Sequence, residues 1–387
     1  MEKVTTSSDV ARLRATAWHE NAWYTALHSV WRFPRRHRTV LRQAVGAVLT
    51  YGIVAAIFWA IVTELSAEAD NSASLDLIQA WQVVALVSLG LVLLLSNAPA
   101  LMIALPGQTL RQAVIANTAG TAVSNTLPEG GAVATGLTFA MTRSWGFRLA
   151  EIARSVLVVD VGNSLVRYTL GGIALAVLAT QPGSPQVFAV VAAAVLVVVA
   201  LAVVVLAQVL RSESFARRVG SLVGTVVNAV LRRLHRQQHP DLPGRVAELR
   251  VGSAELVRQR WLALTVAIAS VQLINCLALG AALHLQGVVE VSWARVVVAY
   301  AGTALISLLM PSPGGLGVAE GSLLTILGNG FGTVSSTPEL VSAVLLYRMA
   351  TWLLPTVVGL FTYLYWRRTQ HARGRRSTQI SQPAAES

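Results

Sequence analysis

Charged and polar side chains inside otherwise apolar segments are the residues of this sequence that could do chemistry. Glu320 follows a Pro- and Gly-rich break in one apolar segment, and Tyr347 and Arg348 lie in the next. An ionised side chain in a bilayer is costly, so it faces a protein interior or a wet cavity and usually pairs with another polar group. We therefore predict an ion pair between Glu320 and Arg348 across the break.

The break before Glu320 could itself bind an anion. It contains Pro313, Gly314, Gly315 and Gly317, and broken backbone in a membrane is tolerated only where protein or a water-filled cavity covers it. Glycines allow the backbone to approach a ligand closely, and the start of the following half-helix presents unpaired N–H groups to a phosphate. The alternative role of each glycine is tight helix packing.

A second broken segment lies nearer the N-terminus and contains Glu129, Gly130 and Gly131. Each break is preceded by an Ala-Gly-Thr-Ala run, one beginning at Ala119 and the other at Ala301. A pair of interrupted apolar segments in corresponding positions is typical of the internal repeats of transporters. Chance is the alternative, because alanine and glycine are common in this chain.

A third polar group follows the first break. Asp160, Asn163 and Arg167 are spaced i, i+3 and i+7 within one apolar segment, so they share a helix face. They could bind a ligand, or they could form a network that packs helices together. Arg167 follows the first break much as Arg348 follows the second.

Membrane-spanning helices must position these residues. The chain has 387 residues and is 54% hydrophobic and 12% charged, whereas soluble proteins average roughly 25% charged residues. Its mean hydropathy is +0.60, and several apolar runs reach the roughly 20 residues that a helix needs to cross a bilayer. We predict an all-α polytopic membrane protein with about six full transmembrane helices and two Pro/Gly-broken helical hairpins. The predicted spans are residues 44–62, 78–105, 150–180, 187–210, 261–285 and 340–366.

Arginine-rich stretches determine the predicted topology, because such stretches favour the cytoplasmic side. We expect a cytoplasmic N-terminal segment 1–43, a transmembrane domain 44–366 that contains a basic cytoplasmic loop 211–260, and a disordered cytoplasmic tail 367–387. With both termini inside, the two broken hairpins enter from opposite sides, which would make an inverted repeat. The basic loop could lie on the membrane surface, bind a cytoplasmic partner or serve only as a topogenic loop.

The sequence disfavours several other classes of protein. It contains no H-E-x-x-H, Walker lysine or G-x-S-x-G motif and no acidic pair at metal spacing. Its single cysteine, Cys276, allows no intrachain disulfide or cysteine cluster. Nucleic-acid binding is disfavoured because no groove-reading or stacking motif accompanies the arginines. We expect no enzymatic activity, no cofactor and no metal site.

The motifs around both breaks resemble those of a known family. Residues 311–320 read Pro-Ser-Pro-Gly-Gly-Leu-Gly-Val-Ala-Glu, residues 345–348 read Leu-Leu-Tyr-Arg, and residues 125–131 read Asn-Thr-Leu-Pro-Glu-Gly-Gly. They are similar to the signature of the lysylphosphatidylglycerol synthase transmembrane region, also called the flippase-like domain family, and the resemblance covers most of residues 42–368. It implies a bacterial inner-membrane protein that moves or handles anionic or lipid-linked substrates. The aminoacyl-transferase domain of the full synthases is absent from this sequence, so lipid aminoacylation is not expected.

Three functions follow as expectations. The first is a flippase or transporter of an anionic phospholipid or polyprenyl-linked lipid. In it, half-helix N-termini with Arg348 or Arg167 hold the phosphate, and Glu320 and Asp160 act as counter-charges or proton carriers. The second is a non-catalytic membrane subunit of a cell-envelope biosynthetic complex, with a partner at residues 211–260. The third is a membrane-embedded transferase acting on polyprenyl lipids, which would need a catalytic acid or metal where the sequence offers only isolated carboxylates.

Overall fold

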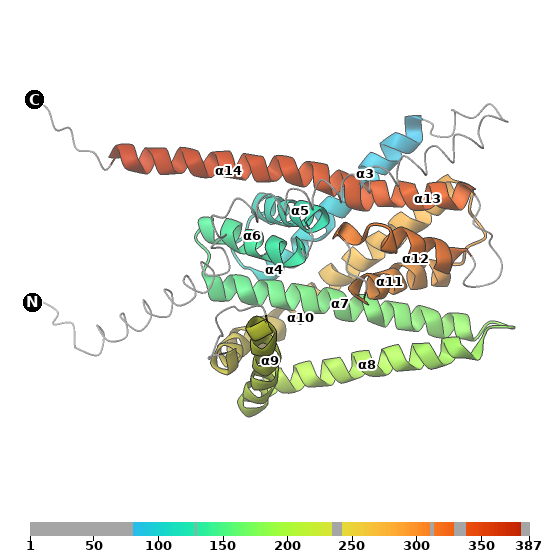
Figure 1. Cartoon of the computed structure of the whole chain (residues 1–387), viewed down its shortest axis with the longest axis horizontal. Coiled ribbons are helices and arrows are strands. Elements are labelled where there is room, and N and C mark those ends of the chain that lie inside the picture. Colours follow the sequence, from blue (N-terminus) through green and yellow to red (C-terminus); the bar gives the residue numbers. More distant parts are fainter. Residues whose placement is uncertain (1–79, 128–129, 234–241, 310–312, 329–337, 381–387) are drawn as a thin grey trace, which may run out of the picture. The chain divides into compact units, whose positions relative to one another are not determined.

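The structure is a computed structural model that describes residues 80–127, 130–233, 242–309, 313–328 and 338–380 (Figure 1). These residues belong to one compact unit, Ala56–Ser387. Helices account for nearly all of the described residues, and no strand occurs among them. The predicted N-terminal segment 1–43 and the first predicted span 44–62 lie outside the described residues.

Five stretches of the described chain are long and apolar enough to cross a membrane, and they match the five predicted spans that the structure describes. The apolar windows are Val87–Ala104, Leu149–Ala179, Gln186–Arg211, Leu249–Leu285 and Pro338–Gln370. The helices that carry them are α3 (Ala80–Ser96), α4 (Ala98–Ala104), α7 (Leu149–Ala179), α8 (Gln186–Arg211), α10 (Leu242–Leu285), α13 (Pro338–Arg348) and α14 (Leu354–Ile380). The all-α polytopic membrane fold predicted from the sequence is confirmed.

The two broken hairpins are made of shorter helices. The first consists of α5 (Leu110–Thr126) and α6 (Gly130–Ser144). The second consists of α11 (Trp293–Leu309), the short 3₁₀ turn η2 (Pro313–Gly315) and α12 (Val318–Leu327). At 1.5 Å per residue the 10 residues of α12 reach only about 15 Å, half of the roughly 30 Å hydrocarbon core. This helix is therefore too short to cross a bilayer by itself.

Each broken hairpin packs against the long span that follows the other hairpin. Helix α5 lies along α14, and α11 lies along α7. Glycines make both contacts close: a Cβ atom on Gly359 of α14 would overlap Thr118 of α5, and one on Gly171 of α7 would overlap Ala301 of α11. Small residues let membrane helices approach in this way. Each hairpin therefore contacts the span that follows the other hairpin, which is the arrangement expected if two similar units pack against each other.

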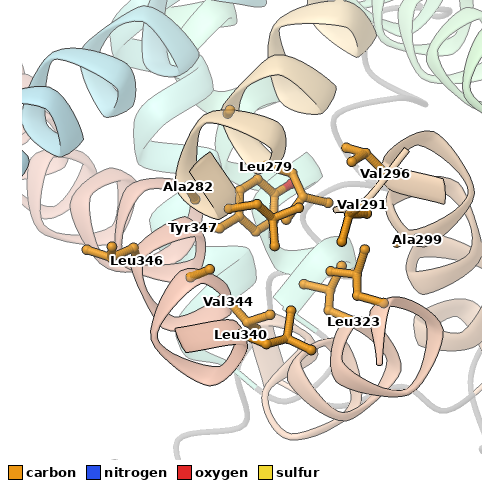
Figure 2. Close-up of a cluster of buried hydrophobic side chains, with 14 of the residues drawn as sticks. Leu279, Ala282, Val291, Val296, Ala299, Leu323, Leu340, Val344, Leu346 and Tyr347 are labelled. Atoms are coloured by element: carbon orange, nitrogen blue, oxygen red, sulfur yellow. The ribbon is translucent and has the colours of Figure 1, made fainter. Parts of the chain in front are cut away.

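The largest buried cluster joins the second hairpin to α10 and α13. Figure 2 shows its apolar side chains converging from these helices, and none of them is more than marginally exposed. Its labelled members are Leu279, Ala282, Val291, Val296, Ala299, Leu323, Leu340, Val344, Leu346 and Tyr347. Because side chains in such a core interlock at near-crystalline density, the cluster fixes α12 against α13 and so positions Glu320 against Arg348.

Two basic segments are more helical than the sequence analysis expected. The segment 211–260, expected as a loop, contains α9 (Glu213–Arg233) and the first part of α10, whose helix is interrupted at Arg260 (φ −129°, ψ 16°). The tail, expected to be disordered, continues α14 as far as Ile380. Propagating a helix that already exists avoids the cost of nucleation, and arginine, glutamine and alanine are good helix formers.

Candidate functional site

The second break is a tight turn that glycines make possible. Gly314, Gly315 and Gly317 have φ angles of 61°, 69° and 76°, a region that other residues enter only at a cost. The turn also packs closely: a Cβ atom on Gly314 would overlap the Trp352 ring and lie 3.0 Å from the carbonyl oxygen of Asn125. Because Asn125 lies near the end of α5, the turn brings the two broken hairpins into contact.

The predicted ion pair between Glu320 and Arg348 is present. Arg348 Nε donates to Glu320 Oε1 at 2.5 Å, and Arg348 Nη2 donates to the carbonyl oxygen of Gly314 at 2.9 Å. The two side chains are only 15% and 17% exposed, while Glu320 Oε2 is buried and has no hydrogen-bond partner among the described residues. The arginine therefore ties α13 both to α12 and to the turn that precedes it.

A π-helical turn follows Arg348 directly. It covers Met349–Leu353, named η4, and the N–H of Leu354 bonds to the carbonyl oxygen of Met349 five residues earlier. The next residue, Pro355, has no N–H with which to continue the α-helical pattern. Such turns occur frequently at functional sites, and this one places Thr351 and Trp352 beside the break.

Arg167 is held by neutral groups. Its Nε donates to Gln272 Oε1 at 3.1 Å, and its guanidinium carbon lies 5.2 Å from the ring centre of Tyr300. Tyr300 also donates to Gln272 Oε1 at 2.8 Å, and Gln272 Nε2 donates to Asn163 Oδ1 at 2.7 Å. Within the described part of the chain, no carboxylate comes within 4.0 Å of Arg167. Asn163 and Arg167 thus belong to one network, whose centre is Gln272.

One cavity of about 990 Å³ brings the two hairpins and both arginines together. Its lining includes residues of both breaks, and of the spans that follow them, that were predicted from the sequence. They are Gly130, Gly131, Arg167, Gly314, Gly315, Tyr347 and Arg348. The cavity is also lined by hydroxyl and amide side chains that the sequence analysis did not single out. They are Ser124, Asn125, Tyr300, Thr303, Ser307 and Thr351.

The remaining predicted residues have other positions. Glu320 contacts Arg348 directly, and Asn163 accepts a hydrogen bond from Gln272, the residue that also holds Arg167. Neither Glu320 nor Asn163 lines the cavity, and Gly317 is an exposed residue at the start of α12. Pro313 begins the turn η2. Glu129 lies outside the described residues.

Asp160 lies apart from the residues that share its helix face. It lines a smaller cavity of about 310 Å³ together with Asn117, Thr121 and Thr138 of the first hairpin. Its side chain makes no hydrogen bond or ion pair with any described residue. Ser124 and Gly131 line both cavities, so the two cavities adjoin at the first break.

Gly130 and Gly131 have different roles at the first break. A Cβ atom on Gly130 would lie 2.6 Å from the carbonyl oxygens of Val123 and Ser124, whereas one on Gly131 would meet nothing within 4 Å. Gly130 therefore permits the chain to turn back closely onto α5. Gly131 leaves open space at the N-terminal end of α6, where unpaired N–H groups and the helix dipole favour an anion.

Four residues at the site were not predicted from the sequence, namely Gln272, Tyr300, Asn125 and Trp352. An available signal was Gln272 itself, an amide inside an apolar span whose side chain is 0% exposed, because polar side chains in such a span usually bond across helices. Asn125 Nδ2 donates to Thr356 Oγ1 at 3.0 Å and so joins α5 to α14. Only the tertiary contact reveals that role.

The chain matches a known family over most of its length. A family model described as the lysylphosphatidylglycerol synthase TM region matches residues 23–359, a range that includes both hairpins and every residue of the central cavity. The chain therefore belongs to this family, as its motifs indicated. A search of curated proteins returned no match. Together with the apolar helices, the match shows a membrane protein of a family associated with lipids.

Proposed function

We propose that the protein moves an anionic phospholipid or polyprenyl-linked lipid across the membrane, with the central cavity as the headgroup site. The observation that carries this proposal is the meeting of both broken hairpins around Arg167 and Arg348 in one cavity. We further propose a bacterial inner-membrane location with both termini in the cytoplasm, because the arginine-rich segments flank the spans.

The size and lining of the cavity suit a phosphate headgroup. Its volume of about 990 Å³ is at the upper end of the roughly 300–1,000 Å³ found for small-ligand sites. Of the donors of Arg167, only Nε bonds to a described residue, which leaves the two terminal nitrogens for a ligand. A guanidinium matches a phosphate with two parallel hydrogen bonds. Gly131 at the start of α6 offers backbone N–H groups at the same cavity.

Arg348 would take a second role in the same transport cycle. Its positive charge is already matched by Glu320 and by the carbonyl oxygen of Gly314. A headgroup that enters the cavity competes with Glu320 for this arginine, and protonation of Glu320 would release it. Asp160 in the adjoining cavity is the second candidate for carrying a proton. We place transport above catalysis because the described groups that meet in the cavity suit an anion and, among themselves, offer no nucleophile beside a base.

The proposal is tested by headgroup accessibility in proteoliposomes. NBD-labelled phosphatidylglycerol and phosphatidylcholine are reconstituted with the protein, and a membrane-impermeant reductant reports how much label reaches the outer leaflet. We expect accelerated movement of the anionic lipid, inhibited by unlabelled polyprenyl phosphate if that class is also carried. Arg167→Gln should slow movement by about tenfold or more, because a hydrogen bond between charged groups contributes about 1.5–3 kcal/mol.

Arg258→Gln is the matched control. Arg258 is exposed on α10, pairs with Glu255 and lies outside the cavity, so its loss should leave movement unchanged. Equal rates for wild type and Arg167→Gln would exclude the headgroup role of the cavity. Absence of movement of any tested lipid by folded protein would instead favour the accessory-subunit interpretation.

A further inference from the structure

We propose a second lipid site, separate from the central cavity, in a crevice between α7, α8 and α10. An anionic phospholipid would place one acyl chain in the crevice and its phosphate against Arg154 and Arg250. The inference concerns lipid retention, so it stands whether or not the central cavity transports lipid.

The crevice has the size and the lining that an acyl chain requires. Its volume is about 530 Å³, and aliphatic side chains of three membrane-spanning helices surround it. Representative lining residues are Leu157, Val161, Leu165, Val203, Leu206 and Val257. None of the residues that line it lines the central cavity. An apolar space between spans takes up a lipid tail more readily than water, since water needs polar partners there.

Polar groups gather at one part of this crevice. Arg250 and Ser253 of α10 belong to its lining, and Arg154 of α7 lies across Gly252, where a Cβ atom would overlap its guanidinium group. Ser253 is 4% exposed, and its Oγ has no hydrogen-bond partner among the described residues. The Nε atoms of Arg154 and Arg250 are likewise buried without a described partner. Buried donors left without partners are costly and call for an explanation.

The positive charges of Arg154 and Arg250 favour a bound anion. In the described ranges no carboxylate lies within 4.0 Å of Arg154 or Arg250, whereas the neighbouring Arg217 and Arg258 each pair with a glutamate of their own helix. Among the described residues, Arg250 bonds only to the carbonyl oxygen of Leu210, at 3.2 Å. Two guanidinium groups without acids, beside a hydroxyl donor, are complementary to a phosphate.

An amphiphile fits this arrangement better than a peptide or a free phosphate does. The apolar crevice lies between spans, and Arg250 is the charged residue among those that line it. Ser253 also belongs to the lining, and Arg154 lies against Gly252, the residue before Ser253. A phospholipid has the same division into an apolar tail and an anionic head. Because arginines favour the cytoplasmic side, where anionic lipid is attracted to basic segments, the lipid would come from the inner leaflet.

Lipid retention by the intact protein tests the proposal. The full chain is extracted in mild detergent, phosphatidylglycerol or phosphatidylcholine is added, and native mass spectrometry counts bound lipid. The measurements use the Arg167→Gln background, which removes the unpaired arginine of the central cavity. We expect Arg154→Gln/Arg250→Gln to reduce phosphatidylglycerol occupancy by about tenfold, because contacts between charged groups are lost. The control Arg217→Gln/Arg258→Gln removes the same charge from exposed ion pairs and should retain the lipid.

A second pair of variants tests binding of the acyl chain in the crevice without changing any charge. Val203→Trp would fill the crevice, whereas Val204→Trp substitutes the adjacent exposed residue that does not line it. We expect reduced phosphatidylglycerol occupancy for the first variant only. Equal occupancy in both members of either pair would overturn the proposal, as would equal retention of free inorganic phosphate and phosphatidylglycerol. Loss of transport in Arg167→Gln with retention intact would separate this site from the central one.

Discussion

The two broken hairpins meet at one cavity, yet the two halves of the molecule hold their arginines by different chemistry. Arg348 is fixed by a carboxylate and a carbonyl oxygen of the second hairpin. Arg167 is fixed by Gln272 and the ring of Tyr300, both neutral. The first arrangement satisfies the positive charge internally, whereas the second orients a guanidinium group and leaves its charge available. From this difference we expect Arg348 to organise the site and Arg167 to contact the anionic headgroup of the proposed substrate.

The strongest test of this contrast breaks the ion pair. Arg348→Ala leaves Glu320 as an uncompensated, largely buried charge, and removing one partner of such a pair costs about 3–5 kcal/mol of unfolding free energy. Thermal unfolding in detergent measures the loss. The double variant Glu320→Leu/Arg348→Met should recover most of it, since an apolar pair of similar volume is often neutral. If both variants were equally destabilised, the side-chain packing and not the charge pair would stabilise α12 against α13.

The next effect concerns the backbone of the second break. Gly314→Ala forces alanine into a left-handed conformation, which costs about 1–2 kcal/mol, and makes its Cβ atom overlap Trp352. We expect a loss of about 2–3 kcal/mol in unfolding free energy. Gly321→Ala is the control, because the same substitution in α12 meets nothing within 4 Å and removes a helix-destabilising glycine. Equal stability of the two variants would contradict the described turn.

The network around Arg167 should produce a smaller change in stability. Gln272→Leu leaves Tyr300, Asn163 and Arg167 without their shared partner, and an unsatisfied buried polar group costs about 1–3 kcal/mol. Gln286→Leu is the comparison, because Gln286 Nε2 is buried and already lacks a described partner. Chemical unfolding should show a deficit for the first variant only. If Gln272→Leu left the free energy of unfolding unchanged, the network would not be what orients Arg167.

The smallest expected effect compares the threonines of the two Ala-Gly-Thr-Ala runs. Thr121 donates to the carbonyl oxygen of Asn117 at 2.8 Å, whereas Thr303 Oγ1 is buried without a described partner. Thr121→Val should therefore cost about 0.5–1 kcal/mol, and Thr303→Val should change stability by less than about 0.5 kcal/mol. Thr303 lines the central cavity, so its variant should still slow lipid movement in the proteoliposome assay. Equal costs would contradict the described hydrogen bonding.

Sequence patterns predicted the spans, both breaks and the pair Glu320–Arg348, because burial in lipid leaves few partners for a charged side chain. They could not reveal that Asp160 lines a different cavity from Arg167, since helical spacing specifies a face and not the helix that packs against it. An amide such as Gln272 in an apolar span indicates a bond to another helix, but its partners Arg167, Tyr300 and Asn163 lie on two other helices and cannot be read from its own segment. The helices over residues 213–233 and 242–260 were expected as a loop because a high density of charged residues is also typical of loops.

The packing of each hairpin against the span that follows the other hairpin affects the order in which the chain folds during synthesis. Helix α5 packs against α14, the last helix of the sequence, whereas α11 finds α7 already synthesised. During synthesis from the N-terminus, the face of α5 around Thr118 cannot be covered until Gly359 of α14 has been synthesised. The first hairpin therefore completes its packing last, although it is translated before the second. A chain that stops before α14 would leave the α14-facing side of α5 uncovered and accessible to quality-control proteases.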